Sequence, residues 1–276
     1  MGNNPGRAIA TRIKQLNQLE EELARCTTPF CGRLTMIAAG VGVAAGLCKH
    51  CIQRKSRHGS AWASSLPAID LKPYRTVAAK WLRDNRGDFF VWHAIIGLRA
   101  LFDGAGRPEK AQDIKRRSAA HKARVAFARL REAGVWPDRL LATHVAVAAA
   151  IADDTYAPRD SEYQLVQVAK AVHRLASGSH YRAEWPMDDG TLIPLKIDTY
   201  PRSSGLVLRV IGKELDEICG SVTARALEEV RAAKVAKYGP HRSKLPGYKP
   251  PWMVAREKAL LGRQQRAAPA APRRGR

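Results

Sequence analysis

Residues 26–51 read CTTPFCGRLTMIAAGVGVAAGLCKHC, and the interpretation of this stretch decides how the rest of the chain is understood. Its middle holds three glycines and no charged residue over positions 34–47, a pattern typical of a nucleotide-binding loop or of a membrane segment. Its two ends each carry a cysteine pair, which is typical of a metal site. These three interpretations predict three different classes of protein.

The glycines lack the context that nucleotide binding requires. A dinucleotide-binding loop lies in a β-α-β unit and needs an acidic residue about 20 positions further on. The next acidic residue is Asp70, at the start of a predicted helix, and the Gly-Lys-Ser/Thr of a phosphate loop is absent. The uncharged run would span only about 21 Å as a helix, whereas a bilayer core measures about 30 Å. Neither interpretation is favoured.

The cysteine spacing favours a metal site instead. The pairs follow the pattern C-x4-C and C-x2-C, and 16 residues separate them. Zinc prefers a tetrahedral set of thiolates or imidazoles, usually offered as two short pairs, and four protein ligands leave no open position. We therefore predict one structural Zn²⁺ ion, with His50 or His58 as substitutes for one cysteine; the alternative is four free thiols in a reduced core. The predicted ligands are Cys26, Cys31, Cys48 and Cys51.

Further residues around the cysteines extend this pattern. The chain reads C-x-x-P-x-C-x-R from Cys26, G-L-C-x-x-C-x-x-R from Gly46, and R-H-G from Arg57. This resembles a small zinc-binding element of phage-type HNH endonucleases and of uncharacterised phage and mobile-element proteins. The resemblance implies the same four cysteine ligands. It covers the N-terminal part only, Cys51 stands where the element usually has histidine, and the linker between the pairs is longer.

The nuclease activity of that family does not follow from the element alone. An HNH site needs a general-base histidine, an asparagine that orients it and a later metal-binding histidine. His58, Asn85 and His93 occur in that order, but the residues between His58 and Asn85 are predicted as a loop and an amphipathic helix rather than a β-hairpin. A divergent metal-dependent HNH endonuclease is kept as an alternative, and a role without catalysis is preferred.

The charge of the chain points to a polyanionic partner. The 276 residues include 47 Lys and Arg against 25 Asp and Glu, for a net charge of +22. Clustered basic charge is typical of nucleic-acid binding, so we predict nucleic acid, with double-stranded DNA ahead of RNA. A protein-binding adaptor is the second alternative. The predicted contacts are Arg54, Lys55, Arg57, Lys115, Arg116, Arg117, Lys170, Arg174, Arg182 and Lys196.

Hydrophobic periodicity predicts a mostly helical fold with one β-hairpin. Asp70 and Ser118 are predicted N-caps, and Asp189-Gly190 between alternating residues predicts the hairpin turn. We expect an N-terminal helix and zinc knuckle in residues 1–62, a helical domain in 63–237, and a disordered, Pro-rich basic tail in 238–276 with one short helix near 252–263. The predicted helices are 7–25, 70–82, 88–103, 118–133, 136–151, 161–177 and 204–237, and the hairpin is 180–198.

The order of helix 138–152, helix 161–177 and hairpin also fits a winged helix. That arrangement would turn the 161–177 helix toward the major groove and use the hairpin as the wing; the competing interpretation is a helical domain with an incidental hairpin. The groove-facing residues would be Gln164, Gln167, Lys170, His173 and Arg174, and the wing residues Tyr181, Arg182 and Lys196.

The N-terminal sequence carries charges through its first 22 residues and lacks the apolar stretch of a signal peptide. We therefore expect a cytoplasmic protein that uses neither a membrane nor a small-molecule substrate. The oligomeric state has no signature in the sequence.

Overall fold

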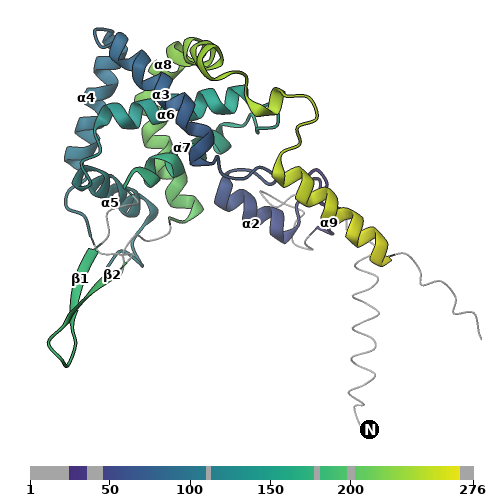
Figure 1. Cartoon of the computed structure of the whole chain (residues 1–276), viewed down its shortest axis with the longest axis horizontal. Coiled ribbons are helices and arrows are strands. Elements are labelled where there is room, and N and C mark those ends of the chain that lie inside the picture. Colours follow the sequence, from purple (N-terminus) through teal and green to yellow (C-terminus); the bar gives the residue numbers. More distant parts are fainter. Residues whose placement is uncertain (1–24, 36–45, 110–112, 177–180, 198–202, 268–276) are drawn as a thin grey trace, which may run out of the picture. The chain divides into compact units, whose positions relative to one another are not determined.

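The computed structural model describes residues 25–35, 46–109, 113–176, 181–197 and 203–267 (Figure 1). The predicted helix over 7–25 therefore lies almost entirely outside the described residues. The chain divides into two units, one formed by Met1–Lys55 with Lys249–Arg276 and the other by Ser56–Tyr248. The division falls within helix α2 (Lys49–His58). Each unit is described by itself.

The larger unit is built of helices, which confirms the predicted mostly helical fold. Two short 3-10 turns accompany them: η2 (Arg174–Ala176) follows α7 (Ser161–His173), and η3 (Arg242–Lys244) follows α8 (Gly205–Tyr238). The helices are α3 (Ala68–Asp84), α4 (Phe89–Gly104), α5 (Ala119–Glu132), α6 (Pro137–Asp153), α7 (Ser161–His173) and α8 (Gly205–Tyr238).

Helix α6 forms the centre of this unit. Nearly all of its residues are buried, from Pro137 at its start to Asp153 at its end. A helix that is apolar on all sides must be covered on all sides. Helices α3, α7, α8 and α4 pack against α6, and α7 and α8 also pack against each other. The alanines and valines in the middle of α6 let these neighbours approach closely.

Side-chain caps fix several helix starts. The Ser118 hydroxyl accepts a hydrogen bond from the His121 amide at 3.2 Å, which confirms the predicted cap of α5. Asp88 caps α4 by accepting from the amides of Phe90 and Val91. The predicted cap at Asp70 is wrong, because α3 begins two residues earlier, after Pro67. Asp70 lies in the first turn instead, where its negative charge interacts favourably with the positive end of the helix dipole.

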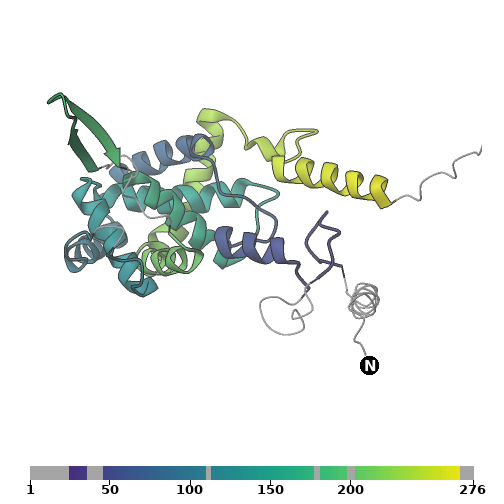
Figure 2. The same cartoon turned by 90° about the horizontal axis from the view of Figure 1, so that it is seen from below.

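The predicted hairpin is present as β1 (Tyr181–Pro186) and β2 (Leu192–Ile197), paired antiparallel. Gly190 has φ 80°, the left-handed conformation that an Asp-Gly turn requires. Figures 1 and 2 both show the hairpin ribbon apart from the helices of this unit.

A buried carboxylate ties four elements of the larger unit together. Asp153, at the end of α6, is 1% exposed. Its carboxylate accepts from the Tyr74 hydroxyl of α3 at 3.0 Å, from Arg231 of α8 at 2.9 Å and from Lys244 of η3 at 3.1 Å. Burial alone would raise the pKa of Asp153, but these hydrogen bonds outweigh it and hold the pKa below its ordinary value.

The smaller unit contains the cysteines and the C-terminal helix α9 (Pro251–Ala267). The extended, disordered tail expected over 238–276 is therefore wrong for residues 251–267, and the short helix expected near 252–263 is longer than predicted. Pro250 precedes the helix and Pro251 is its first residue, where proline is tolerated because the missing amide would be unpaired there. Within the described residues, no helix is both long and apolar enough to cross a membrane.

We expect Asp153→Asn to lower the free energy of unfolding of the chain by about 2 kcal/mol at pH 7, because hydrogen bonds to a charged group are lost. The depressed pKa means that the stabilisation is present above the unfolded-state pKa of about 3.9 and is lost as the pH falls through the lower native value. Urea unfolding between pH 7 and pH 3 measures both effects. Asp84→Asn is the control, because its pair with Lys80 lies at the surface and should contribute under about 0.5 kcal/mol. Equal effects of the two variants would contradict the role given to Asp153.

Candidate metal centre

The first cysteine pair lies in a tight loop. The amide of Cys26 donates to the Arg33 carbonyl at 2.8 Å, and the amide of Cys31 donates to the Thr28 carbonyl at 3.0 Å. Between Cys26 and Arg33 the chain reverses its direction at Phe30 and Gly32, whose φ angles are 55° and 59°. The loop therefore folds back so that both thiols of the pair face one side.

The second pair is presented by the start of α2. Gly46, with φ 71°, turns the chain into this helix, and the Thr27 amide donates to the Gly46 carbonyl at 2.8 Å. Cys48 and Cys51 are three residues apart, so one helical turn places them on the same face. The hydrogen bond between Thr27 and Gly46 holds this turn against the first loop.

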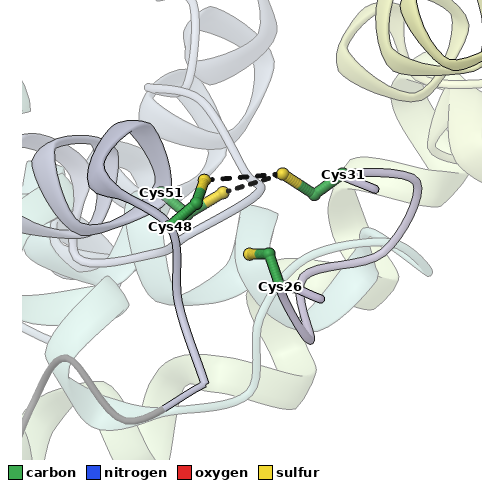
Figure 3. Close-up of side chains that lie close together, drawn as sticks. All are labelled: Cys26, Cys31, Cys48 and Cys51. Carbon is green, nitrogen blue, oxygen red and sulfur yellow. Dashed lines mark hydrogen bonds between the residues drawn. The ribbon is translucent and has the colours of Figure 1, made fainter. Parts of the chain in front are cut away.

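Figure 3 shows the four cysteine side chains converging from these two elements. The Sγ atom of Cys31 lies 3.6 Å from that of Cys48 and 3.6 Å from that of Cys51. All four Sγ atoms lie within 4.8 Å of one another, and all four residues are buried free cysteines. In the part of the chain that the structure describes, no other group of three or more His, Cys, Asp or Glu residues is arranged to hold a metal ion. The cluster could bind one metal ion.

Hydrogen bonds and burial act in opposite directions on the thiols. Burial would raise the pKa of Cys26, but hydrogen bonds with the Thr28 hydroxyl and with the backbone of Cys48 and Thr28 lower it to about 6. Burial raises the pKa of Cys51 to about 12 and raises the pKa of Cys31 as well. A bound metal cation would lower these pKa values, because cysteine binds a metal as the thiolate and the positive charge stabilises that buried anion.

Helix α9 contacts the first cysteine loop although more than 200 positions separate them in the sequence. Arg256 donates to the Pro29 carbonyl at 3.0 Å, and its guanidinium lies 3.9 Å from the Sγ atom of Cys51. Arg263 donates to the Cys31 carbonyl. Neither arginine was among the residues predicted from the sequence, because residues 238–276 were expected to form a tail.

Neither histidine considered as a substitute ligand belongs to the cluster. His50 is exposed on α2. The Nδ1 atom of His58 lies 3.1 Å from the Ser65 hydroxyl and 3.0 Å from the Lys170 ammonium. The other residues of the HNH pattern are also engaged elsewhere: Asn85 donates to the Trp81 carbonyl, and the His93 ring lies against Phe89.

The predicted major-groove face of α7 is turned toward the protein, which contradicts the winged-helix arrangement. Gln167 is buried, donates to the His58 carbonyl at 2.9 Å and accepts from the Leu66 amide at 3.0 Å. Lys170 donates to Ser65, and Arg174 donates to the Leu66 carbonyl at 2.8 Å. The face packs against residues 58–66 because Gln167 and Arg174 satisfy backbone groups there and Lys170 bonds a side-chain hydroxyl. His173 lies 3.0 Å from the Ser203 hydroxyl, and Gln164 is half-buried.

The remaining predicted nucleic-acid contacts occupy several places. Lys115, Arg116 and Arg117 are exposed in the turn before α5. Arg57 is exposed on α2, where Arg54 and Lys55 are half-buried. Arg182 and Lys196 are register partners in the hairpin. These residues do not form one continuous element.

Comparison with protein-family models, curated proteins and solved structures finds no match to this chain.

We expect purified protein to contain about one bound metal ion per chain, as a closed four-thiolate site holds one. Cys31→Ser should reduce this content severalfold, because the Cys31 thiol is in contact with two of the other ligands. Elemental analysis after gel filtration measures the content.

Cys219→Ala is the matched control for the metal measurement. Cys219 is fully buried in α8 of the other unit, so its removal perturbs a core without touching the cluster. Loss of metal in both variants, or in neither, would contradict the assignment of the four cysteines.

Proposed function

We propose that this chain is a zinc-stabilised nucleic-acid-binding protein, with DNA ahead of RNA as its target. One observation carries the proposal: the described residues of the unit that holds the four cysteines include ten Lys and Arg and a single acidic residue, Glu257. A rigid, metal-clamped unit of such composition is an electrostatic match for phosphates.

The sulfur geometry supports zinc as the metal. A tetrahedral site with Zn–S bonds of about 2.3 Å places its sulfurs about 3.8 Å apart. The Sγ atom of Cys31 lies 3.6 Å from two of its neighbours, close to that spacing. Four thiolates fill the coordination sphere, so the ion supplies folding energy and orders the two loops rather than activating a water molecule. Arg256 offsets part of the negative charge that four thiolates concentrate around one divalent ion.

The cations of this unit are placed to meet a polyanion. Lys49 is exposed beside the second cysteine pair, and Lys258 is exposed on α9. The metal holds the first loop and the start of α2 together, which keeps their cations at fixed spacing. The resemblance of the cysteine element to phage-type HNH proteins supports a phage, plasmid or other mobile-element setting.

The proposal predicts a steep salt dependence of binding. Fluorescence anisotropy with a labelled DNA duplex should show log K falling linearly with log salt concentration, because each phosphate contact releases counterions. The double variant Lys49→Gln, Lys258→Gln should reduce the slope by about two, since about one unit is lost for each contact. A slope near zero for the wild-type protein would refute the proposal.

Lys213→Gln is the control for nonspecific charge loss. Lys213 is exposed on α8 in the other unit and pairs with Glu217. Its removal should leave the slope unchanged. The same duplex incubated with Mg²⁺ or Mn²⁺ tests the nuclease alternative: cutting that disappears in His58→Ala would replace a binding role with an enzymatic one.

A further inference from the structure

A groove of about 590 Å³ lies between α3 and α6 in the larger unit. Its walls carry five cationic side chains and one carboxylate, Asp138, which lies 3.6 Å from Arg86. The other four cations are exposed or half-buried, and no ion pair to them is present among the described residues. The cations of the groove are Lys72, Arg75, Arg83, Arg86 and Arg139.

Helical spacing aligns these charges. Lys72, Arg75 and Arg83 recur on one face of α3, and Arg86 continues the line just beyond the helix. The opposite face of α3, which includes Tyr74 and Val77, is in the core. From Lys72 to Arg83 the helix rises by about 16 Å. The groove therefore presents a row of positive charge rather than a single anion pocket.

Four of the five cations in the groove have no ion pair among the described residues, whereas Arg86 pairs with Asp138. Repulsion among these like charges costs free energy in the absence of a ligand, and a bound anion would relieve it.

Trp136 stands at the end of the groove and is 72% exposed. It precedes Pro137 at the start of α6, so the proline and the helix restrict its backbone. The same indole borders a second hollow of about 360 Å³, whose walls include Arg99, Arg131 and one carboxylate, Asp103. The exposed indole thus has guanidinium groups in the hollows on both of its sides.

This combination distinguishes among anionic ligands. In a duplex the base faces are covered by stacking, so an indole in a groove can stack only on an unpaired base. A single nucleotide would engage only part of a charged row about 16 Å long. A lipid surface would be met best by a convex face, whereas these cations line a hollow. A flexible single strand uses both the aromatic plane and the row.

We propose that the α3–α6 groove binds a single-stranded polynucleotide, with a base stacked on Trp136 and the phosphates paired with the cations of α3. This inference deepens the proposed nucleic-acid binding by assigning a second, strand-selective surface. It involves only residues of the larger unit and does not depend on the metal.

The test compares labelled single-stranded oligo(dT), oligo(U) and a duplex of equal length on the full chain. Trp136→Ala should weaken binding of the single strands about fivefold or more, as expected for the loss of one stacked base, and Trp136→Phe should restore most of it. Duplex binding should change less than twofold. Trp92→Ala is the control, because Trp92 is 56% exposed on α4 outside the groove.

The outcomes separate this inference from the proposed function. If Trp136→Ala leaves single-strand binding unchanged while duplex binding persists, only the groove is refuted. Salt-insensitive duplex binding together with Trp136-dependent single-strand binding would refute the proposed function alone. If thymidine monophosphate at equal nucleotide concentration competes with the single strand, the groove binds a small nucleotide and the polynucleotide proposal is refuted. Trp136-dependent binding to phosphatidylserine vesicles, without single-strand binding, would refute the proposal and show that the groove binds a membrane surface.

Discussion

The near-complete burial of α6 is the constraint on which the larger unit depends. From Leu140 to Ile151 every residue is buried, so the helix is stable only while α3, α4, α7 and α8 surround it. This requirement determines which faces of those helices turn inward, and therefore which of their residues remain exposed to solvent. The charged row of α3 faces the solvent because Leu71, Tyr74 and Val77 are needed against α6. Asp153 then closes the arrangement where α6 ends.

The sequence predicted the helices well because their signals are local. Apolar spacing and caps such as Ser118 depend on neighbours within a few residues, and the cysteine pairs are each contained in one turn. The metal cluster was predictable for the same reason. The predicted N-cap at Asp70 was wrong by about one turn, because the helix begins after Pro67 and the sequence offers both residues as helix-start signals.

Long-range packing explains what the sequence could not reveal. Gln167 and Lys170 look like an exposed polar face of α7, yet they satisfy backbone and side-chain groups of residues 58–66, about a hundred positions away. Nothing near them in the chain indicates that partner. The same holds for Arg256, whose proline-rich surroundings suggested a tail. The groove was missed because only the packing of α3 beside α6 turns a charged helix face into a hollow.

The joining of the cysteine loop and α9 into one unit has a consequence for biosynthesis. The two parts of this unit are translated at different times, because all of Ser56–Tyr248 is made between them. The helical unit can fold on the ribosome while the carbonyl groups of Pro29 and Cys31 still lack Arg256 and Arg263. Until α9 emerges, the nascent chain carries all four clustered cysteines without these two guanidinium contacts. Assembly of the smaller unit therefore waits for synthesis of the larger one, and the delay is set by the length of the inserted chain.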